Sequence, residues 1–320
     1  MKLMKNCFFL LSMLMISQGS VLSQGLIVVP GNEKHGTPWN VGNIISKFNA
    51  SNDSFVEIYR DSQLDFWEEN IKVSPNGRLI GAVGMMKGHY LDKNFASYTR
   101  FSLVLFDSTG KLQKRIVDVP LFDWSPSGDS IVYVTGKTYS DKEYPSTDRL
   151  WLLDLQTGKT VDLGTTMHYT RGIVWTKFDG QIYVHEGGVY RINPTTKVKQ
   201  LTGYRDINFS PDGKYYFVTN PEPQYFRIYE RETNKDVTPA FIHGMFVTNF
   251  SKWLSDSKGL VIGDVSFEKK IYDVETKTIR TTFQGNILGY NPQTNEIYVH
   301  KDKRYFKGIP ASKVYKIEAK

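Results

Sequence analysis

Two long polar segments and several short connectors hold the residues that could bind a ligand. The segments span 84–100 and 136–149, and they mix Tyr, Arg, Lys and His side chains. Such mixtures are the usual anchors of protein interfaces and sugar-binding surfaces. The predicted ligand-binding residues are Lys87, His89, Tyr98, Arg100, Tyr139, Tyr144, His168, Tyr169, Arg171, Tyr204, Arg205 and His243. The alternative is that the Tyr side chains pack the loops onto a scaffold and the Arg side chains, with Arg149 among them, pair with nearby Asp.

Patterns that mark an enzyme nucleophile or a metal centre are absent from the sequence. There is no G-x-S-x-G string, no His-x-x-x-His pair and no pair of cysteines. We therefore predict no catalytic residue, no metal site and no cofactor. His185 and His300 both end the string IYVH, and we interpret them as strand positions rather than ligands.

The elements that must position the candidate residues come from a repeat. Six turn-like strings each stand between two short apolar runs, and their mean spacing is about 44 residues, which is typical of four-stranded propeller blades. The strings are SPNG (74–77), SPSG (125–128), KFDG (177–180), SPDG (210–213), SDSKG (255–259) and NPQTN (291–295). A second hairpin follows most of them, and these hairpins span 101–116, 150–163, 188–201, 226–239 and 269–283. Two hairpins per unit make one four-stranded blade.

The repeat predicts an all-β fold, a β-propeller of six four-stranded blades. The last unit has only three strands, within 287–292, 296–302 and 313–319, so we expect 54–61 to supply its missing outer strand and to close the ring. Residues 24–53 are then an N-terminal extension. The stretch 40–48 could be another strand, which keeps seven blades open. A β-sandwich is the alternative fold, but six turns in the same register argue against it.

The repeat also predicts which end of the propeller carries function. The Ser-Pro-x-Gly turns and the turns of the second hairpins lie at one end. The connections between the second and third strands, and between successive units, lie at the other. Because the two long segments are such connections, we expect the candidate residues to gather at that second end.

The strings SPNGRLIGAVG, SPSGDSIVYVTG and SPDGKYYFVTN, each followed by a turn such as DLQTGK or DVETKT, resemble the WD-repeat-like propeller of the TolB family. The resemblance covers about 70–320 and implies the propeller fold. TolB itself is a periplasmic protein-binding factor with an extra N-terminal α/β domain, for which residues 24–70 leave no room. The resemblance implies little about function, because Ser, Pro and Gly build a turn and do no chemistry.

The N-terminus predicts export. Lys2 and Lys5 precede an apolar run from Cys7 to Ile16, which is too short to span a bilayer and is typical of a secretory signal peptide. Cleavage after Ser23 leaves a single domain over 24–320 with no cysteine and no membrane segment. The net charge falls from +7 to +5, since two Lys and no acid are lost, and this mild excess does not favour a nucleic-acid partner. We expect a periplasmic or secreted monomer.

Two functions fit these predictions. The first is a non-catalytic propeller that binds a protein or a glycan of the cell envelope through its long loops. The alternative is a propeller-type polysaccharide lyase, or another carbohydrate-active enzyme, in which His168 or His89, a Tyr and Arg171 or Arg205 converge on a uronate. The sequence favours the first and leaves catalysis open.

Overall fold

The computed structural model describes the strands of the protein and the short turns between them. The described residues are 28–31, 42–49, 54–87, 101–136, 148–165, 170, 172–186, 188–202, 207–221, 224–242, 251–254, 256–263, 268–291, 296–300 and 314–318. Apart from one short 3-10 helix, η1 (Ala240–Ile242), every regular element among them is a strand.

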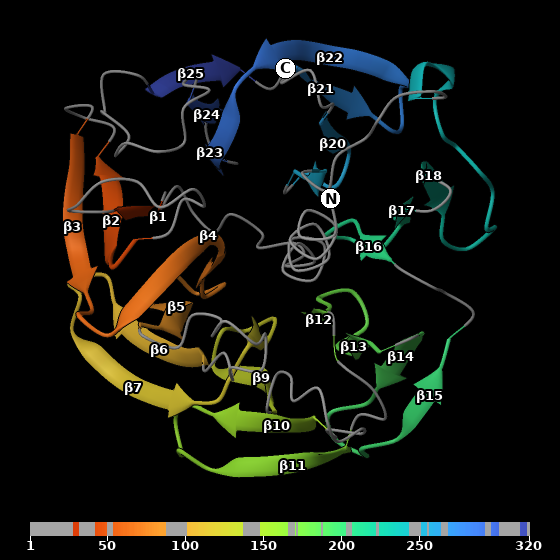
Figure 1. The fold of residues 1–320 in the computed structure, drawn as a ribbon. Coiled ribbons are helices and arrows are strands. Elements are labelled where there is room, and N and C mark those ends of the chain that lie inside the picture. Colours follow the sequence, from red (N-terminus) through yellow and green to blue (C-terminus); the bar gives the residue numbers. More distant parts are fainter. Residues whose placement is uncertain are drawn as a thin grey trace, which may run out of the picture.

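The strands form antiparallel sheets that follow one another around a ring (Figure 1). Sheet 1 contains β1 (Val28–Gly31), β2 (Ile44–Asn49) and β3 (Ser54–Arg60), and sheet 2 contains β4 (Leu64–Val73), β5 (Leu79–Met86), β6 (Phe101–Asp107) and β7 (Leu112–Val117). Sheet 3 contains β8 (Leu121–Trp124), β9 (Ser130–Thr135), β10 (Arg149–Asp154) and β11 (Thr160–Thr165). Sheet 4 contains β12 (Gly172–Trp175), β13 (Ile182–His185), β14 (Val189–Ile192) and β15 (Lys199–Leu201).

The second half of the ring contains the remaining three sheets. Sheet 5 contains β16 (Asn208–Phe209), β17 (Tyr215–Pro221) and β18 (Gln224–Glu230), and η1 follows it. Sheet 6 contains β19 (Lys252–Trp253), β20 (Gly259–Gly263), β21 (Glu268–Asp273) and β22 (Thr278–Gln284). Sheet 7 contains β23 (Asn286–Asn291), β24 (Glu296–His300) and β25 (Val314–Glu318). The predicted β-propeller fold is therefore confirmed.

The predicted number and closure of the blades are wrong. Among the described residues, only sheets 2, 3, 4 and 6 have four strands, so neither six nor seven complete four-stranded blades are present. Strand β3, expected to complete the last unit, pairs instead with β2. The physical reason is that β1 and β2, inside the supposed extension 24–53, give β3 a partner of its own. Strand β1 lies beside β4 and β23, so sheet 1 stands between the first and last repeat units (Figure 1).

The Ser-Pro-x-Gly strings form the predicted reversals. In SPDG, the Ser210 hydroxyl accepts the Tyr215 N–H at 2.9 Å, and the Asp212 carboxylate accepts the Lys214 N–H at 3.0 Å. Gly213 has a φ of 70°, a left-handed conformation that Gly adopts without steric cost. Ser74 and Ser125 accept the corresponding N–H groups of Leu79 and Ser130 at 2.9 and 3.0 Å. These residues build turns, as the sequence indicates.

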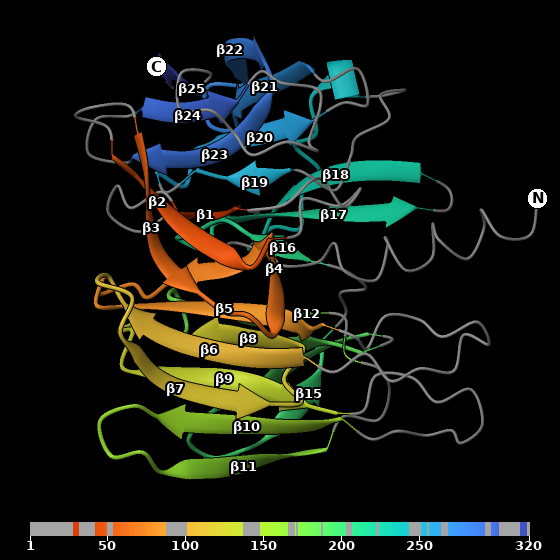
Figure 2. The same ribbon diagram turned by 60° about the vertical axis from the view of Figure 1, so that its left-hand side comes forward.

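We name the two ends of the ring by their connections. The turn end carries the Ser-Pro-x-Gly turns and the turns of the second hairpins, and the loop end carries the connections between sheets and, in sheets 2 to 7, those after the second strand. Strands β5, β6, β9 and β10 run between these two ends (Figure 2). A ligand at one end is thus separated from a ligand at the other by the length of a strand.

The core lies between neighbouring sheets. Leu103, Leu105, Phe122, Trp124 and Tyr133 form one buried cluster between sheets 2 and 3. Sheets 1 and 2 meet through Tyr59 and Phe106, whose rings stack with centroids 4.4 Å apart. Each sheet therefore buries both faces against its neighbours, and this burial is the main force that closes the ring.

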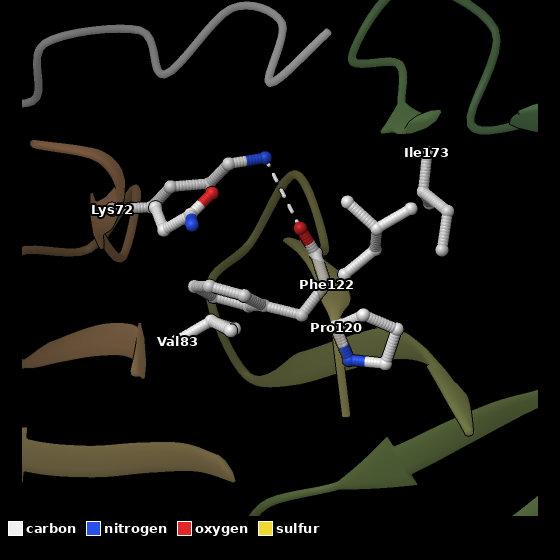
Figure 3. Close-up of a pocket in the computed structure, with 7 residues that line it drawn as sticks. Lys72, Val83, Pro120, Phe122 and Ile173 are labelled. Atoms are coloured by element: carbon white, nitrogen blue, oxygen red, sulfur yellow. Dashed lines mark hydrogen bonds between the residues drawn. The ribbon is translucent and has the colours of Figure 1, made fainter. Parts of the chain in front are cut away.

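One polar link runs through this apolar packing and joins three sheets. The Lys72 ammonium on β4 reaches sheet 3, where it donates to the Phe122 carbonyl at 3.1 Å (Figure 3). It also donates to the Asp123 carboxylate at 3.0 Å. The other oxygen of Asp123 accepts the main-chain N–H of Trp175 on β12 at 2.7 Å. The Trp124 indole returns a hydrogen bond to the Lys72 carbonyl at 3.0 Å. Lys72 and Asp123 are both buried, so this pair is shielded from solvent.

A glycine in the second-hairpin turn of sheet 2 fixes its contact with sheet 1. Gly110 has a φ of 86°, and a Cβ at this position would stand 1.5 Å from the Ile58 carbonyl oxygen on β3. Gly158 occupies the matching turn of sheet 3 with a φ of 70°, and nothing lies within 4 Å of its Cβ position. The two glycines share a backbone conformation and differ in what surrounds them.

We predict that Lys72→Met lowers the free energy of unfolding by about 3–5 kcal/mol, because Asp123 would be left as a buried charge without its cation. The double variant Lys72→Met/Asp123→Leu should recover most of that loss. Lys270→Met, which breaks the partly exposed pair between Lys270 and Glu268, is the matched control and should cost about 1 kcal/mol or less. Urea titration measures all three, and a Lys72→Met loss no larger than the control's would contradict the prediction.

We predict that Gly110→Ala destabilises the protein more than Gly158→Ala. The Gly158 variant has only the left-handed backbone cost of about 1–2 kcal/mol. The Gly110 variant has the same cost and must also push β3 away from the turn. Thermal unfolding of the two variants side by side checks this difference. Equal shifts in Tm would mean that the contact between Gly110 and Ile58 contributes nothing.

Candidate functional site at the loop end

The structure describes only one of the twelve predicted ligand-binding residues, Lys87. The other eleven lie outside the described residues, and they are His89, Tyr98, Arg100, Tyr139, Tyr144, His168, Tyr169, Arg171, Tyr204, Arg205 and His243. What the structure shows is the scaffold to which their segments attach. The candidate site is therefore built from the described residues that flank those segments.

Lys87 stands at the loop end, directly after β5. Its N–H donates to the Gln63 carbonyl at 2.8 Å, which ties the start of the long segment 88–100 to the connection between sheets 1 and 2. Its ammonium lies 3.8 Å from the Asp65 carboxylate, and the side chain is exposed. An exposed pair at this distance is weak, so the Lys87 ammonium remains accessible to an anionic group of a ligand.

Asp148 and Thr170 join the other two candidate segments. Asp148 follows the long segment 137–147, and Thr170 lies within the connector between sheets 3 and 4, beside Tyr169 and Arg171 in the sequence. The Thr170 N–H donates to the Asp148 carboxylate at 3.0 Å, and both residues are buried. This bond places the end of one predicted ligand segment against the middle of another.

Gly136 makes room for this anchor. A Cβ at Gly136 would stand 2.0 Å from the Asp148 Oδ1 atom, so any larger residue would displace the carboxylate. Sequence reasoning missed Asp148 because an Asp beside an Arg at the end of a polar loop is unremarkable. Its burial is visible only once the Thr170 connector has been placed against it.

The electrostatics around Asp148 are those of a buried acid. Burial raises the pKa of the Asp148 carboxyl, the hydrogen bonds from Thr170 oppose that rise, and the nearby Glu186 carboxylate adds to it. Glu186 is also buried and forms an ion pair with Lys199 on β15. Buried carboxyls with a raised pKa are frequent at functional sites.

Two residues interpreted from sequence have definite places at this end. His185 is the last residue of β13 and is buried, which confirms its interpretation as a strand position. Arg149 pairs with Asp162 on β11, and its guanidinium lies 5.3 Å from the centre of the Trp151 ring. The Asp162 carboxylate raises the pKa of Arg149. For this residue, the alternative in which Arg pairs with a nearby Asp is the one observed.

A small cavity beside Lys72 is a second place where chemistry could occur. Its volume is about 10 Å³, enough for about one water molecule. Asn70, Lys72, Pro120 and Phe122 line it, with Val83 and Ile173 at its sides (Figure 3). Because the cavity admits nothing larger than water and both partners of the Lys72–Asp123 pair are bonded, we assign this pair a structural role.

The described part of the chain contains neither a metal-binding cluster nor a helix that could cross a membrane. Within it, no group of three or more His, Cys, Asp or Glu side chains could hold a metal ion. No helix among the same residues has the length and apolar character needed to cross a membrane. The candidate site therefore offers carboxylates, a lysine and the segments attached to them.

Comparisons with known proteins define the fold. No family model matches the chain, and no curated protein matches its sequence. Among solved structures, the hydrazine synthase of Kuenenia stuttgartiensis matches with a TM-score of 0.56 and 13% identity, over 94% of this chain and 97% of that one. An oligogalacturonate lyase in complex with manganese matches with a TM-score of 0.48 and 9% identity, over 69% and 68%. At these identities the first likeness shows a shared propeller fold and nothing about function, and the second is too distant to carry an argument. The TolB resemblance is borne out at the level of the propeller.

Proposed function

We propose that this chain is a binding propeller that acts after export and holds a protein or glycan of the cell envelope at its loop end. The proposal rests on one observation above all. The buried hydrogen bond between Thr170 and Asp148 brings two of the predicted ligand segments together on adjacent sheets. Long polar segments anchored to rigid sheets are the usual way in which a propeller presents a binding surface.

The chemistry of the segments supports binding rather than catalysis. Their Tyr, Arg and His side chains suit interfaces and sugar surfaces. The N-terminal sequence, with two Lys ahead of an apolar run, supports export, and an exported propeller would meet proteins and glycans of the envelope. The polysaccharide lyase stays as the alternative, since its proposed His, Tyr and Arg residues belong to the same segments.

The test compares the two ends of one sheet. A photo-crosslinking amino acid is placed at Lys87, at the loop end of sheet 2, and in a second variant at Lys111, at its turn end. Both side chains are exposed. We expect Lys87 to crosslink a discrete envelope component and Lys111 to crosslink none in common with it. A third variant with the segment 88–100 shortened should lose the component.

Two outcomes would count against this proposal. Equal crosslinking from both ends would show that the loop end is not selective. Release of unsaturated products from a uronate polymer by the purified chain, abolished by His168→Ala, would replace binding with the lyase alternative. The mature chain, residues 24–320, serves for all of these measurements.

A prediction concerns Asp148 as the anchor of the site. Asp148→Asn keeps an oxygen that accepts the Thr170 N–H and should retain ligand capture, whereas Asp148→Leu should lose it because the connector is released. Since burial raises the folded-state pKa of Asp148, its charge disfavours folding above that pKa. The native chain should therefore lose stability relative to Asp148→Asn as the pH rises from about 4, the unfolded pKa of Asp, towards neutrality.

Thermal unfolding across this pH range measures the effect, with Asp162→Asn as the control. Asp162 is a more exposed carboxyl whose pKa Arg149 lowers, so its removal should act with the opposite sign. A pH-independent difference between the native chain and Asp148→Asn would contradict the prediction.

A further inference from the structure

We propose a second binding site at the turn end, between sheets 4 and 5, where Arg231 and Phe178 receive the carboxylate of a peptide beside an aromatic residue. Arg231 lies in the turn that follows β18, and Phe178 lies in the turn between β12 and β13. The site is independent of the loop-end proposal, because it uses the opposite end of the ring and none of the same residues.

Arg231 presents a cation that no described acid neutralises. Its guanidinium carbon lies 4.5 Å from the centre of the Phe178 ring, within the range of a cation–π contact. Its Nε atom is buried and has no hydrogen-bond partner among the described residues, and none of the ion pairs found there involves Arg231. The guanidinium has therefore lost water on one side without gaining a hydrogen bond, a cost that an anion would offset.

The packing of Phe178 holds the guanidinium in place. Gly213 leaves room for the ring, since a Cβ at this position would stand 2.2 Å from Phe178 Cγ. The Arg231 N–H donates to the Lys214 carbonyl at 2.9 Å, which fixes the Arg backbone beside the same turn. The SPDG turn of sheet 5 thus supports both halves of the site, and the terminal nitrogens of Arg231 remain as a planar pair of donors.

Asp179, the acid next to Phe178 in the sequence, is already engaged. Asp179 accepts the Tyr183 hydroxyl at 2.8 Å and the Gln181 N–H at 3.0 Å, and it also accepts the Thr176 hydroxyl. It is therefore poorly placed to turn towards Arg231. Lys177, which is exposed beside Phe178, adds a second positive charge next to the proposed site.

The surrounding rings determine what else the ligand should carry. Phe209 lies edge-on to Phe178, with ring centres 5.1 Å apart, and is itself only partly buried. A planar Arg fork on an aromatic ring recognises carboxylates by two parallel hydrogen bonds, and the adjoining rings favour an aromatic neighbour. A peptide carboxylate next to an aromatic side chain combines both features.

The test uses N-acetyl-L-phenylalanine as the probe and its amide as the matched uncharged compound. In the full mature chain, the Nε–H signal of Arg231 in a ¹H–¹⁵N spectrum should shift on addition of the acid and stay unchanged with the amide. Arg231→Lys keeps the charge but loses the fork, and it should weaken binding by about tenfold. Arg78→Lys changes an exposed Arg of another turn and should bind as the native chain does.

Phe178→Leu provides a second variant in which the Arg remains and the ring is lost. We expect it to weaken binding as well, with the fold checked by the unchanged spectrum of residues in sheets 2 and 3. Equal affinity for the acid and the amide, or no shift of the Arg231 signal, would overturn the proposal. Tighter binding of galacturonate than of N-acetyl-L-phenylalanine would overturn the assignment to a peptide.

Discussion

The arrangement of the sheets depends on contacts between neighbours. Among these, the buried ion pair between Lys72 and Asp123 has the strictest geometric requirement. The short connections between propeller sheets do not fix how one sheet is positioned against the next, and apolar contacts are not directional. The ion pair, with the second carboxylate oxygen bonded to the Trp175 N–H, ties sheets 2, 3 and 4 together, and a shift of one sheet would break bonds in a buried site. The indole of Trp124 donates to the Lys72 carbonyl on the neighbouring sheet, and Trp253 makes the equivalent bond between sheets 6 and 5, where its indole donates to the Asn208 carbonyl at 3.0 Å.

The two ends of the molecule differ in how their connections are held. At the turn end, side chains are largely committed to their own turns: Asp107, Asp154, Asn193 and Asp273 each accept an N–H two residues further on at 2.9 Å. At the loop end, the connections after β5 and after β9 are long, and the bond between Asp148 and Thr170 anchors the second of them to the connector between sheets 3 and 4. Sequence can vary between such anchors without disturbing the ring, so connections at this end are suited to ligand binding.

The turns and the propeller fold were predictable because their signals are local. A Ser-Pro-x-Gly string with flanking apolar runs is enough to predict a chain reversal, and the string IYVH is enough to predict that His185 is a strand residue. Closure was not predictable, because β1 and β2 have no repeat motif and their pairing with β3 is set by the ring. The bond between Lys72 and Asp123 joins residues 51 positions apart, and nothing in their spacing indicates it. The role of Asp148 was not predictable for the same reason, because its partner Thr170 lies 22 positions away. Eleven of the twelve predicted ligand-binding residues lie outside the described residues.

A residue that departs from the repeat at an equivalent turn position indicates a role other than forming the turn. The second-hairpin turns of sheets 2, 3, 4 and 6 begin with Asp or Asn, whereas that of sheet 5 begins with Glu230 and continues with Arg231. Glu230 accepts the Thr233 hydroxyl at 2.6 Å, so the turn closes without the usual Asx bond. Arg231 then stands where its counterparts are Ser108, Leu155, Pro194 and Val274, none of which carries a charge. A cation that the turn does not require, held on a ring from the neighbouring sheet, costs desolvation and contributes nothing to the reversal. Such a residue is better explained by a ligand than by the scaffold.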